Sequence, residues 1–483
     1  VTDEESKSTL ARTYLTLTRT EVLAAGLIEP ATGGVLTVDV PEHRLDGVSL
    51  AFAPWSTTEP FVATIGDMTD NPPAERVNMR YTLELGPAGT NFDTPVTVTV
   101  PLPKALHSSQ VVNALRFDPA AGDWTEEGIE EVSYAETPFP AVVFSTAEFS
   151  IFAVTVTRPI WDLGTMGGVN SFAFAVSEGR DVVGYSYLYV STNDRHAFRW
   201  NVAERYLDLG TLGWKHSFAF DINEFGEIAG YYEFESGVPT RPFIWDEVNG
   251  MRDLGTFGGS YTYAYNLNDA GAVVGSSTYP NGTRRAFLWT EAGGMQDLGT
   301  LGGSGSYALS INNAGEVTGG AQHASGETHV FLWDAAHGMA DLGTLGGDAA
   351  LGNAINYFGL CVRQSRMASG DVRALVWDES GGLRGIGPAG TPTSYAKGVN
   401  NAGLVVGNVL SDIVDEEEVY HACQWGQADN FAAIRDLHDY IDPNYPHTLI
   451  DAWDINENGD IVGSMEVIDE GRPANHAFLL GNE

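Results

Sequence analysis

A unit of about 44 residues repeats along the chain from about residue 160 onward, and it constrains the fold more than any other feature. A tryptophan ends the same apolar segment six times, at Trp200, Trp245, Trp289, Trp333, Trp377 and Trp425. Repeats of this length are typical of propeller blades and solenoid units, in which each repeat is one supersecondary unit.

One repeat, residues 306–343, divides into four short segments rich in apolar residues: "YALSIN", "EVTGGA", "HVFLW" and "MADLG". Asn, Gly, Ser and Asp separate the segments, as expected for turns between strands. No helical periodicity competes with this pattern. Four strands in about 44 residues are typical of one propeller blade, so the sequence predicts an all-β array.

The third and fourth segments of the repeat each occur seven times, but out of phase with the ends of the array. The third segment is centred on Phe198, Phe243, Phe287, Phe331, Leu375, Cys423 and Phe478. The fourth begins at Asp162, Asp208, Asp253, Asp297, Asp341, the degenerate Gly385, and Asp436. The array thus begins with a fourth strand and ends with a third. Pairing these two ends would remove two open sheet edges, so we predict a seven-bladed β-propeller over 158–483 with 3+1 strand closure.

The repeat resembles the HAF repeat family, named for the His-Ala-Phe found here at 196–198 and 476–478. The resemblance also rests on "DLGTLGG", which occurs at 297–303 and again at 341–347. It covers about 160–480. It implies an extracellular location, secreted or on the cell surface, with a signal peptide already removed before Val1.

Residues 1–157 lack the repeat and alternate apolar and polar residues as strands of a β-sandwich do. The stretch "GPAGTNFDTPVTVTVPLP" at 86–103 resembles the ZU-type domain of ankyrins and netrin receptors. We therefore expect an N-terminal ZU-like β-sandwich over 1–157, followed by the propeller.

The chain carries 64 acidic and 25 basic residues, a net charge of −39. Nucleic acids and anionic lipids bind through Lys and Arg, so this balance argues against both as partners. It suits a saline medium, cations such as calcium, or basic partners. No apolar run is long enough for a membrane span. The two cysteines, Cys361 and Cys423, match no disulfide framework or CxxC metal site, and the sequence leaves open whether they are bridged.

Seven basic or imidazole residues precede the Ala-Phe position of the repeats: His196, Arg241, Arg285, His329, Arg373, His421 and His476. They are either a ring of positive charge for an anionic ligand or structural partners of the Asp in the neighbouring "DLG" strand. Because a ligand site seldom needs seven copies, the sequence favours the structural interpretation.

Oxygen-bearing side chains alternate in "DINENGDIVG", at Asp454, Asn456, Asn458 and Asp460. Calcium prefers such ligands on a tight turn. Met465, however, stands where an EF-hand loop has its Glu, and the same frame recurs elsewhere as an ordinary Asn-Gly turn. Calcium is the only cofactor that the sequence proposes.

Aromatic residues concentrate in the loops of the first three repeats, where exposed rings would stack on sugars or contact a protein. The candidate ligand-binding residues are Tyr187, Tyr189, Trp214, His216, Tyr232, Phe234, Tyr261 and Tyr279. The alternative is that these rings pack in the core or against the N-terminal domain. Catalytic signatures such as GxSxG, HExxH and the P-loop are absent, so no catalytic residue is assigned.

Three functions remain open from the sequence. The leading hypothesis is a non-enzymatic secreted or cell-surface binding or assembly protein whose propeller face contacts extracellular glycan or protein. The second is an extracellular polysaccharide-active enzyme, lyase-like, with His, Tyr and Arg residues in the propeller mouth. The third is a structural subunit of a surface layer or filament, which would require a homo-oligomer or larger assembly.

Overall fold

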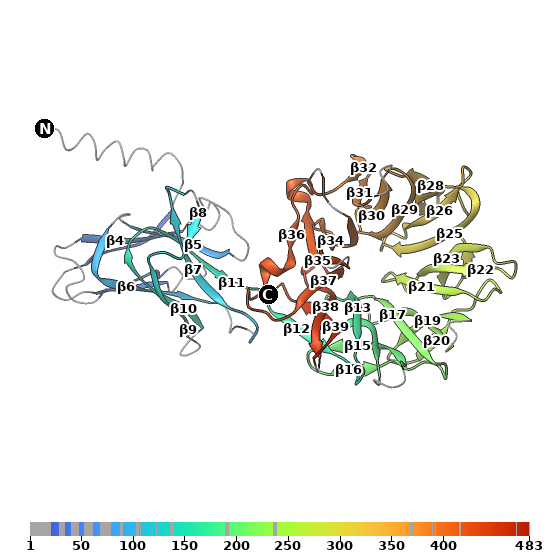
Figure 1. The fold of residues 1–483 in the computed structure, drawn as a ribbon, viewed down its shortest axis with the longest axis horizontal. Helices are drawn as coiled ribbons and strands as arrows, with labels where there is room; N and C mark the ends of the chain where they lie inside the picture. Colours follow the sequence, from blue (N-terminus) through green and yellow to red (C-terminus); the bar gives the residue numbers. More distant parts are fainter. Residues whose placement is uncertain are drawn as a thin grey trace. The chain divides into compact units, whose positions relative to one another are not determined.

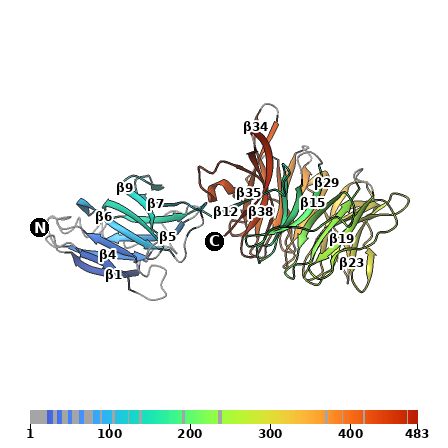
Figure 2. The same cartoon turned by 90° about the horizontal axis from the view of Figure 1, so that it is seen from below.

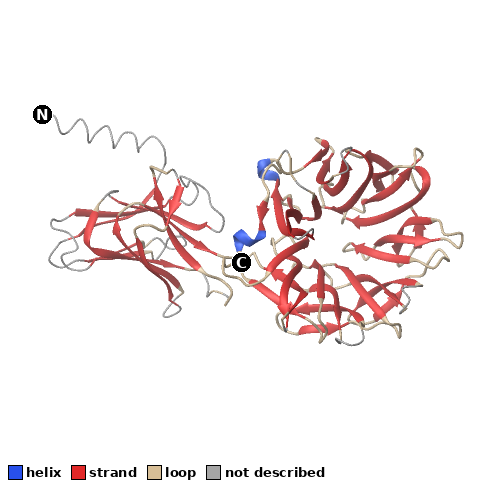
Figure 3. Cartoon of the chain, viewed as in Figure 1, coloured by secondary structure: helices blue, strands red, loops and turns tan. Residues whose placement is uncertain are grey.

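The computed structural model describes residues 21–28, 34–39, 48–52, 61–67, 79–86, 90–102, 106, 108–121, 123–135, 140–188, 193–234, 239–367, 371–388, 390–391, 393–414, 417–469 and 471–482. The chain divides into two compact units. Unit 1 comprises residues 1–159 with 440–442, and unit 2 comprises 160–439 with 443–483. Strands account for almost all of the described secondary structure (Figure 1, Figure 3). None of the helices described is long and apolar enough to cross a membrane.

Unit 1 contains two antiparallel sheets that share one apolar core. The six-stranded sheet has the order β1(Glu21–Ile28), β4(Phe61–Asp67), β5(Met79–Gly86), β11(Ile151–Val156), β7(Val112–Asp118), β8(Asp123–Thr125). The five-stranded sheet has the order β2(Gly34–Thr37), β3(Ser49–Phe52), β6(Asn91–Pro101), β10(Ala141–Glu148), β9(Ile129–Ala135). Val96, Val98 and Val100 alternate inward from β6 and join Phe144 of β10 and Phe152 of β11 in one buried cluster. Burial of one face of each sheet explains the period-two pattern of the sequence.

Unit 2 is built from antiparallel groups of four strands, as the blades of a β-propeller are. Five of these groups are separate sheets, and two more are joined into an eight-stranded sheet by a single parallel pairing of β27 with β29. The first three groups are β13(Ser171–Val176), β14(Val182–Tyr187), β15(Arg195–Asn201), β16(Arg205–Asp208); β17(His216–Ile222), β18(Ile228–Glu233), β19(Thr240–Asp246), β20(Gly250–Asp253); and β21(Thr262–Leu267), β22(Val273–Thr278), β23(Arg284–Thr290), β24(Gly294–Asp297).

The two groups within the eight-stranded sheet are β25(Gly302–Ile311), β26(Val317–His323), β27(Thr328–Asp334), β28(Gly338–Gly343), and β29(Gly346–Ile355), β30(Cys361–Met367), β31(Val372–Asp378), β32(Gly382–Gly385). The last two groups are β33(Ser394–Val399), β34(Leu404–Val414), β35(Glu417–Gly426), β36(Arg435–Asp436), and β37(Thr448–Ile455), β38(Ile461–Asp469), β39(Arg472–Leu480), β12(Ile160–Gly164). Two short 3-10 helices, η1(Gln427–Asp429) and η2(Leu437–Tyr440), flank β36. The hairpin of β34 and β35 projects beyond the other sheets of unit 2 (Figure 2).

The first strand of each group contacts the first strand of the next, and the contacts run in a cycle. β13 contacts β17, and the series continues through β21, β25, β29 and β33 to β37, which contacts β13. The sheets are accordingly arranged around the middle of unit 2 (Figure 1). At the join between the chain's two ends, β12 pairs antiparallel with β39, with Trp161 opposite Leu479.

A relay of buried asparagines makes six of the seven junctions between neighbouring four-stranded groups; the first group has Ser177 at this position instead. Each side-chain Nδ2 donates to the backbone carbonyl of the equivalent residue in the next group, at 2.9–3.1 Å: Asn223 to Asn268, Asn268 to Asn312, Asn312 to Asn356, Asn356 to Asn400, Asn400 to Asn456, and Asn456 to Ser177. The Oδ1 of each Asn accepts the backbone N–H four residues later, which closes its own turn. One amide thus satisfies a local turn and an inter-sheet contact together.

The "DLG" motif is a structural joint. The Asp carboxylate accepts the backbone N–H of the Gly two residues on, for example Gly164 N to Asp162 at 2.8 Å and Gly210 N to Asp208 at 2.8 Å. These glycines have positive φ, 71° at Gly164 and 79° at Gly210, which a residue with a Cβ rarely adopts. The motif therefore turns the chain from one sheet into the next.

The group of β29–β32 breaks the repeat in its core. In the other groups the second strand carries a glycine at this position, opposite a phenylalanine in five of them and opposite Cys423 in the sixth. A Cβ at Gly230 would lie 2.7 Å from the Phe243 ring. Here Arg363 replaces that glycine, and Leu375 replaces the phenylalanine opposite it. Arg363 is fully buried, and its Nη2 donates to Thr318 at 3.4 Å. Its Nε and Nη1 have no hydrogen-bond partner among the described residues. Burial lowers the pKa of this guanidinium, and the neighbouring Cys361 thiol opposes that shift. Cys361 and Cys423 are both buried free thiols.

Replacing Asn312 by Ala should lower the free energy of unfolding by about 2–4 kcal/mol, because the Glu316 N–H and the Asn356 carbonyl lose their buried partner. The exposed Asn249→Ala, whose amide bonds only to the neighbouring Asp246, should cost no more than about 0.5 kcal/mol. Urea unfolding of both variants measures the difference, and equal losses would contradict a role for the relay.

The Arg363–Leu375 pair predicts a compensating double substitution. Arg363→Gly alone should leave a void, and Leu375→Phe alone should overpack the core; each should lower the free energy of unfolding by about 1–3 kcal/mol. The double variant restores the glycine-phenylalanine pair of the other groups and removes a buried, poorly satisfied guanidinium. Its melting temperature should equal or exceed that of the native chain. Additive losses in calorimetry would show that the two residues are not coupled.

Candidate functional site

A cavity of about 540 Å³ lies among the first strands of the groups in unit 2. Its lining includes one residue at the same position of every first strand: Phe174, Phe220, Tyr265, Leu309, Asn353, Lys397 and Trp453. Volumes of 300–1,000 Å³ are typical of small-molecule sites. The cavity is therefore the candidate functional site.

A β-bulge places these seven residues. In every first strand the register with the second strand slips at this position, for example between Ala173 and Ala175 and between Ala219 and Asp221. The same slip occurs in the other five groups. A bulge inserts an extra residue that the ladder does not pair, and it re-aims the local side chains. Here the bulged residue and, in most groups, the residue after it line the cavity.

Four neighbouring first strands contribute an aromatic wall. The Phe174 and Phe220 rings stack with centroids 4.8 Å apart and planes 8° apart. Trp453 meets Phe174 edge to face at 5.0 Å, and Tyr265 meets Phe220 at 5.7 Å. Behind them, Tyr231 stacks on Phe220 at 5.6 Å. These contacts hold the rings in fixed orientations, so the wall presents a rigid apolar surface.

Polar side chains line the remainder of the cavity. They are Asn353, Gln364, Tyr395, Lys397, Asn408 and Tyr420. The Lys397 ammonium pairs with Asp451 and lies 3.5 Å from the centroid of the Trp453 ring. Asn353 donates to the Ala396 carbonyl at 2.6 Å. The Oδ1 atom of Asn408 is buried and has no hydrogen-bond partner in the described part of the chain.

Two carboxylates also line the cavity, on either side of β13. Asp221 Oδ2 accepts the Asn266 amide at 2.6 Å and the Leu267 backbone N–H at 2.9 Å. Asp454 Oδ2 accepts the Val176 backbone N–H at 3.1 Å. Burial raises the pKa of Asp221 well above its ordinary value and raises the pKa of Asp454 to about 6. Each carboxylate therefore bridges to the next sheet and also lines the cavity, where burial disfavours its charged form.

Sequence reasoning missed this site, although the repeats contain a signal for it. The seven bulged residues directly follow a small residue that is Ala in six repeats and Gly in one. The preceding position is thus nearly constant, whereas the bulged position holds Phe, Tyr, Leu, Asn, Lys or Trp. A position whose residue type varies between otherwise similar repeats is not constrained by the fold, so its side chain is available to contact a ligand.

The aromatic residues proposed from the sequence as a ligand surface lie elsewhere, and none of those described lines the cavity: Tyr187, Trp214, His216, Tyr232, Phe234, Tyr261 and Tyr279. Tyr189 falls outside the described residues. The ring centroid of Trp214 lies 4.3 Å from that of Phe234 and 5.0 Å from that of Tyr232, so these three rings pack against one another. Tyr279 stacks on Phe257 at 5.0 Å. His216 is buried, and its Nδ1 accepts the Arg195 backbone N–H at 3.2 Å.

Most of the seven basic positions contact the Asp of the adjacent fourth strand. The Nδ1 atoms of the four histidines lie 2.7–2.9 Å from a carboxylate oxygen: His196 with Asp208, His329 with Asp341, His421 with Asp436, and His476 with Asp162. Arg285 Nε lies 3.7 Å from Asp297.

Two positions depart from this pairing. In the group of Arg241, Asp253 accepts the Tyr232 hydroxyl. Arg373 faces Gly385 and donates to backbone carbonyls instead, among them Gly387 at 3.1 Å.

The residues proposed for calcium bind protein groups instead. Asp460 receives two bonds from Arg180, at 2.8 and 2.9 Å, and a third from the Asn482 backbone N–H. Asn456 takes part in the asparagine relay, and the Asn458 amide donates to the Glu178 carbonyl. Asp454 accepts the Val176 N–H, as above. The Arg180 guanidinium binds both carboxylate oxygens of Asp460, which a calcium ion would have to coordinate. The turn bonds to Ser177 and Glu178, and it thus joins the last four-stranded group to the first.

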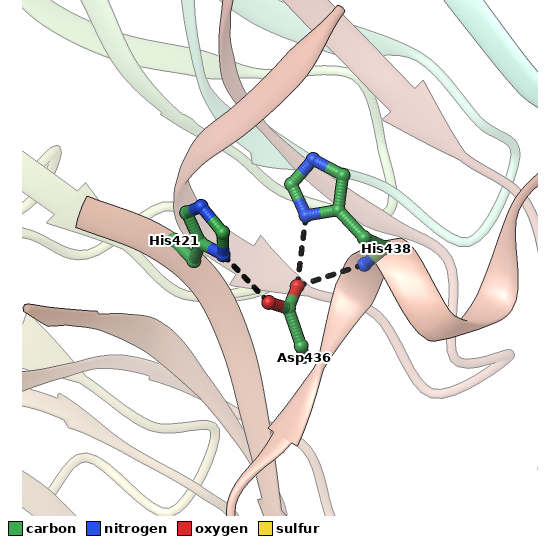
Figure 4. Close-up of side chains that lie close together, drawn as sticks. All are labelled: His421, Asp436 and His438. Atoms are coloured by element: carbon green, nitrogen blue, oxygen red, sulfur yellow. Dashed lines mark hydrogen bonds and ion pairs between the residues drawn. The ribbon is translucent and has the colours of Figure 1, made fainter. Parts of the chain in front are cut away.

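Within the part of the chain that the structure describes, one group of His, Cys, Asp and Glu side chains is close enough to hold a metal ion: His421, Asp436 and His438 (Figure 4). Asp436 accepts His421 Nδ1 at 2.7 Å, His438 Nδ1 at 2.8 Å and the His438 backbone N–H at 2.9 Å. His438 Nε2 accepts the Leu449 N–H at 2.9 Å, so its ring is neutral and its proton lies on Nδ1, facing Asp436. A metal at Nδ1 would have to displace that proton. The geometry therefore fits a hydrogen-bonded brace better than a metal centre.

No family model matches the chain. No curated protein matches its sequence. Among solved structures it is similar to TolB from Acinetobacter baumannii (TM-score 0.38, 10% identity, 55% of this chain and 65% of that one). It is also similar to a mutant of puromycin hydrolase (TM-score 0.46, 12% identity, 66% and 53%) and to a mutant of the Aleuria aurantia lectin (TM-score 0.28, 11% identity, 56% and 96%). It thus spans less than two thirds of the length of TolB and of puromycin hydrolase. These are β-propeller proteins, and lectins and hydrolases share that fold.

The hydrogen-bonded cluster of His421, Asp436 and His438 predicts how the stability of the protein changes as the pH falls. Burial acts to raise the pKa of Asp436, but hydrogen bonds from His438 and His421 outweigh it and lower the pKa from 3.8 to about 2. The stability that this carboxylate contributes is therefore present above pH 3.8 and is lost as the pH falls through about 2. Asp436→Asn should melt at a lower temperature than the native chain at pH 7, and the gap should narrow as the pH falls through that window.

The control for this prediction is Asp348→Asn, because the Asp348 side chain is 71% exposed. Its melting curve should follow that of the native chain at every pH. A gap for Asp436→Asn that stays constant from pH 7 to about pH 2 would contradict the prediction.

Proposed function

We propose that the chain is a secreted or cell-surface binding protein that holds a sugar unit in the central cavity of a seven-bladed β-propeller and catalyses no reaction. In this proposal unit 2 is a propeller of HAF-type repeats with 3+1 closure, and residues 1–157 are a ZU-like β-sandwich. The partner is an extracellular glycan, free or attached to a protein.

The propeller architecture is supported by the strand contacts of unit 2. The first strands contact one another in a cycle from β13 to β37, and the pairing of β12 with β39 joins the two ends of the repeat array in one sheet. A linear stack of repeats would leave both terminal sheets uncovered. For unit 1, the support is a single apolar core shared by two antiparallel sheets.

The observation that carries the binding proposal is the aromatic wall of Trp453, Phe174, Phe220 and Tyr265, with amides and phenols around the rest of the cavity. The apolar face of a sugar ring stacks on aromatic rings, and its hydroxyl groups need donors and acceptors at the edges. The cavity supplies both in a volume of about 540 Å³. Rings already held by one another lose little freedom on binding, which favours affinity.

The charges of the cavity favour binding over the lyase-like alternative. β-Elimination from a uronic acid needs positive charge beside the sugar carboxylate and a base near the α-proton. Lys397 is the only basic side chain among the described lining residues, and Asp451 pairs with it. Asp221 and Asp454, the acidic residues of the lining, supply no positive charge to a uronate in either protonation state. His216 and Tyr261, which the sequence analysis named as candidate ligand-binding residues, are not among the lining residues.

Phe220→Ala should reduce affinity for the bound glycan at least about tenfold, because it removes a central ring of the wall. The ligand is found with a glycan array, and the affinities are then measured by calorimetry. Phe225→Ala is the matched control, since the Phe225 side chain is 76% exposed on a turn outside the cavity, and it should bind as the native chain does. Melting temperatures establish that both variants are folded. Absence of glycan binding by the native chain, or an unchanged affinity in Phe220→Ala, would contradict the proposal.

A further inference from the structure

We propose that the cavity selects a sugar that carries a positively charged amine, such as an unacetylated 2-amino-2-deoxyhexose unit. This inference rests on the proposed glycan-binding function and names the class of sugar. It is carried by the charge and hydrogen-bonding character of the lining, described in three steps.

The first step is the charge balance of the cavity. Its lining holds Asp221, Asp454 and Lys397. Lys397 is paired with Asp451, so its charge is already compensated. Among the described residues, neither Asp221 nor Asp454 forms an ion pair with a basic side chain, and both accept bonds only from N–H groups. The cavity therefore contains two carboxylates that no described basic side chain pairs with. Burial disfavours their charged forms, and a cationic ligand beside them would stabilise those forms.

The second step concerns the aromatic wall. An ammonium group already lies on it, because Lys397 Nζ sits 3.5 Å from the centroid of the Trp453 ring. Phe174 meets the same Trp453 ring edge to face at 5.0 Å, and Asp454 directly follows Trp453 in the chain. Aromatic faces attract cations, most strongly where water is excluded. A second ammonium on this wall would meet both a ring face and a carboxylate.

The third step is an acceptor without a donor. Asn408 is 9% exposed and lines the cavity, and its Oδ1 has no hydrogen-bond partner among the residues that the structure describes. A buried acceptor left unsatisfied costs free energy that a ligand donor recovers. An ammonium group offers three donors and no acceptor, which complements a lining with two carboxylates and a vacant amide oxygen. A neutral N-acetyl group offers one donor and adds an acceptor of its own.

The test compares two ligands that differ only at the amine. The β-1,4-linked trimer of glucosamine and the same trimer fully N-acetylated are titrated into the full chain at pH 7 by calorimetry. The glucosamine trimer should bind about tenfold more tightly than the acetylated one, because its ammonium group can form an ion pair with a cavity carboxylate and the acetamide group cannot. Asp221→Asn should abolish this preference while leaving affinity for the acetylated trimer within about twofold. Asn retains the acceptor that Asn266 and Leu267 use, so the variant should remain folded.

Control variants separate this inference from the proposed function. Glu379→Gln removes an exposed carboxylate outside the cavity and should keep the full preference for the amine. Should Asp221→Asn melt early, Asp454→Asn provides the same test on the other side of β13. Equal affinity for the two trimers, or a preference that persists in both Asp variants, would overturn the inference and leave glycan binding intact. Binding of neither trimer would overturn it as well, and the glycan array then decides the proposed function separately.

Discussion

The asparagine relay is the interaction on which the arrangement of unit 2 depends. Sheets that pack face to face are held by apolar contacts, which have no direction and would tolerate sliding. The relay adds direction, because each amide must reach the carbonyl of one particular residue in the next sheet. The same amide oxygen closes the turn from which the side chain projects. In six of the seven repeats, local turn geometry and the spacing between sheets are therefore set by a single residue.

This rigid frame allows the cavity lining to vary. The bulge in each first strand leaves one residue out of the hydrogen-bonded ladder, so its side chain is not required for sheet pairing. Four neighbouring repeats place aromatic rings there, and the remaining three place Leu309, Asn353 and Lys397. A repetitive frame can thus support a lining that is aromatic on one side and polar on the other. A ligand meets this asymmetric lining, whereas the repeated residues hold the sheets together.

Much of the fold was predictable because it follows from local patterns. The four segments of each repeat became four strands, and the "DLG" motif became a turn rather than a site, since its Asp is used by the backbone of the following Gly. The calcium turn and the aromatic loops illustrate the opposite case. Asp460 was judged by residue type, and its partner Arg180 lies 280 positions away in the chain, where sequence spacing does not connect the two. Trp214 contacts Phe234 across the β17–β18 hairpin of its own repeat. Arg363 likewise looks unremarkable until its burial beside Leu375 is known.

The sequence by itself determined the all-β class, the four-strand unit and the position of each turn, because these depend on the period of apolar residues and on glycine and asparagine at fixed places. Only the tertiary structure decided which side chains face a common space. Phe174 and Trp453 are 279 positions apart in the chain, yet their rings are 5.0 Å apart. That contact exists because β37, the first strand of the last group, packs beside β13, the first strand of the first group. A register slip in each of these strands turns one side chain into the cavity. Neither the packing of distant strands nor the direction of a bulged residue is encoded in the local pattern of either segment.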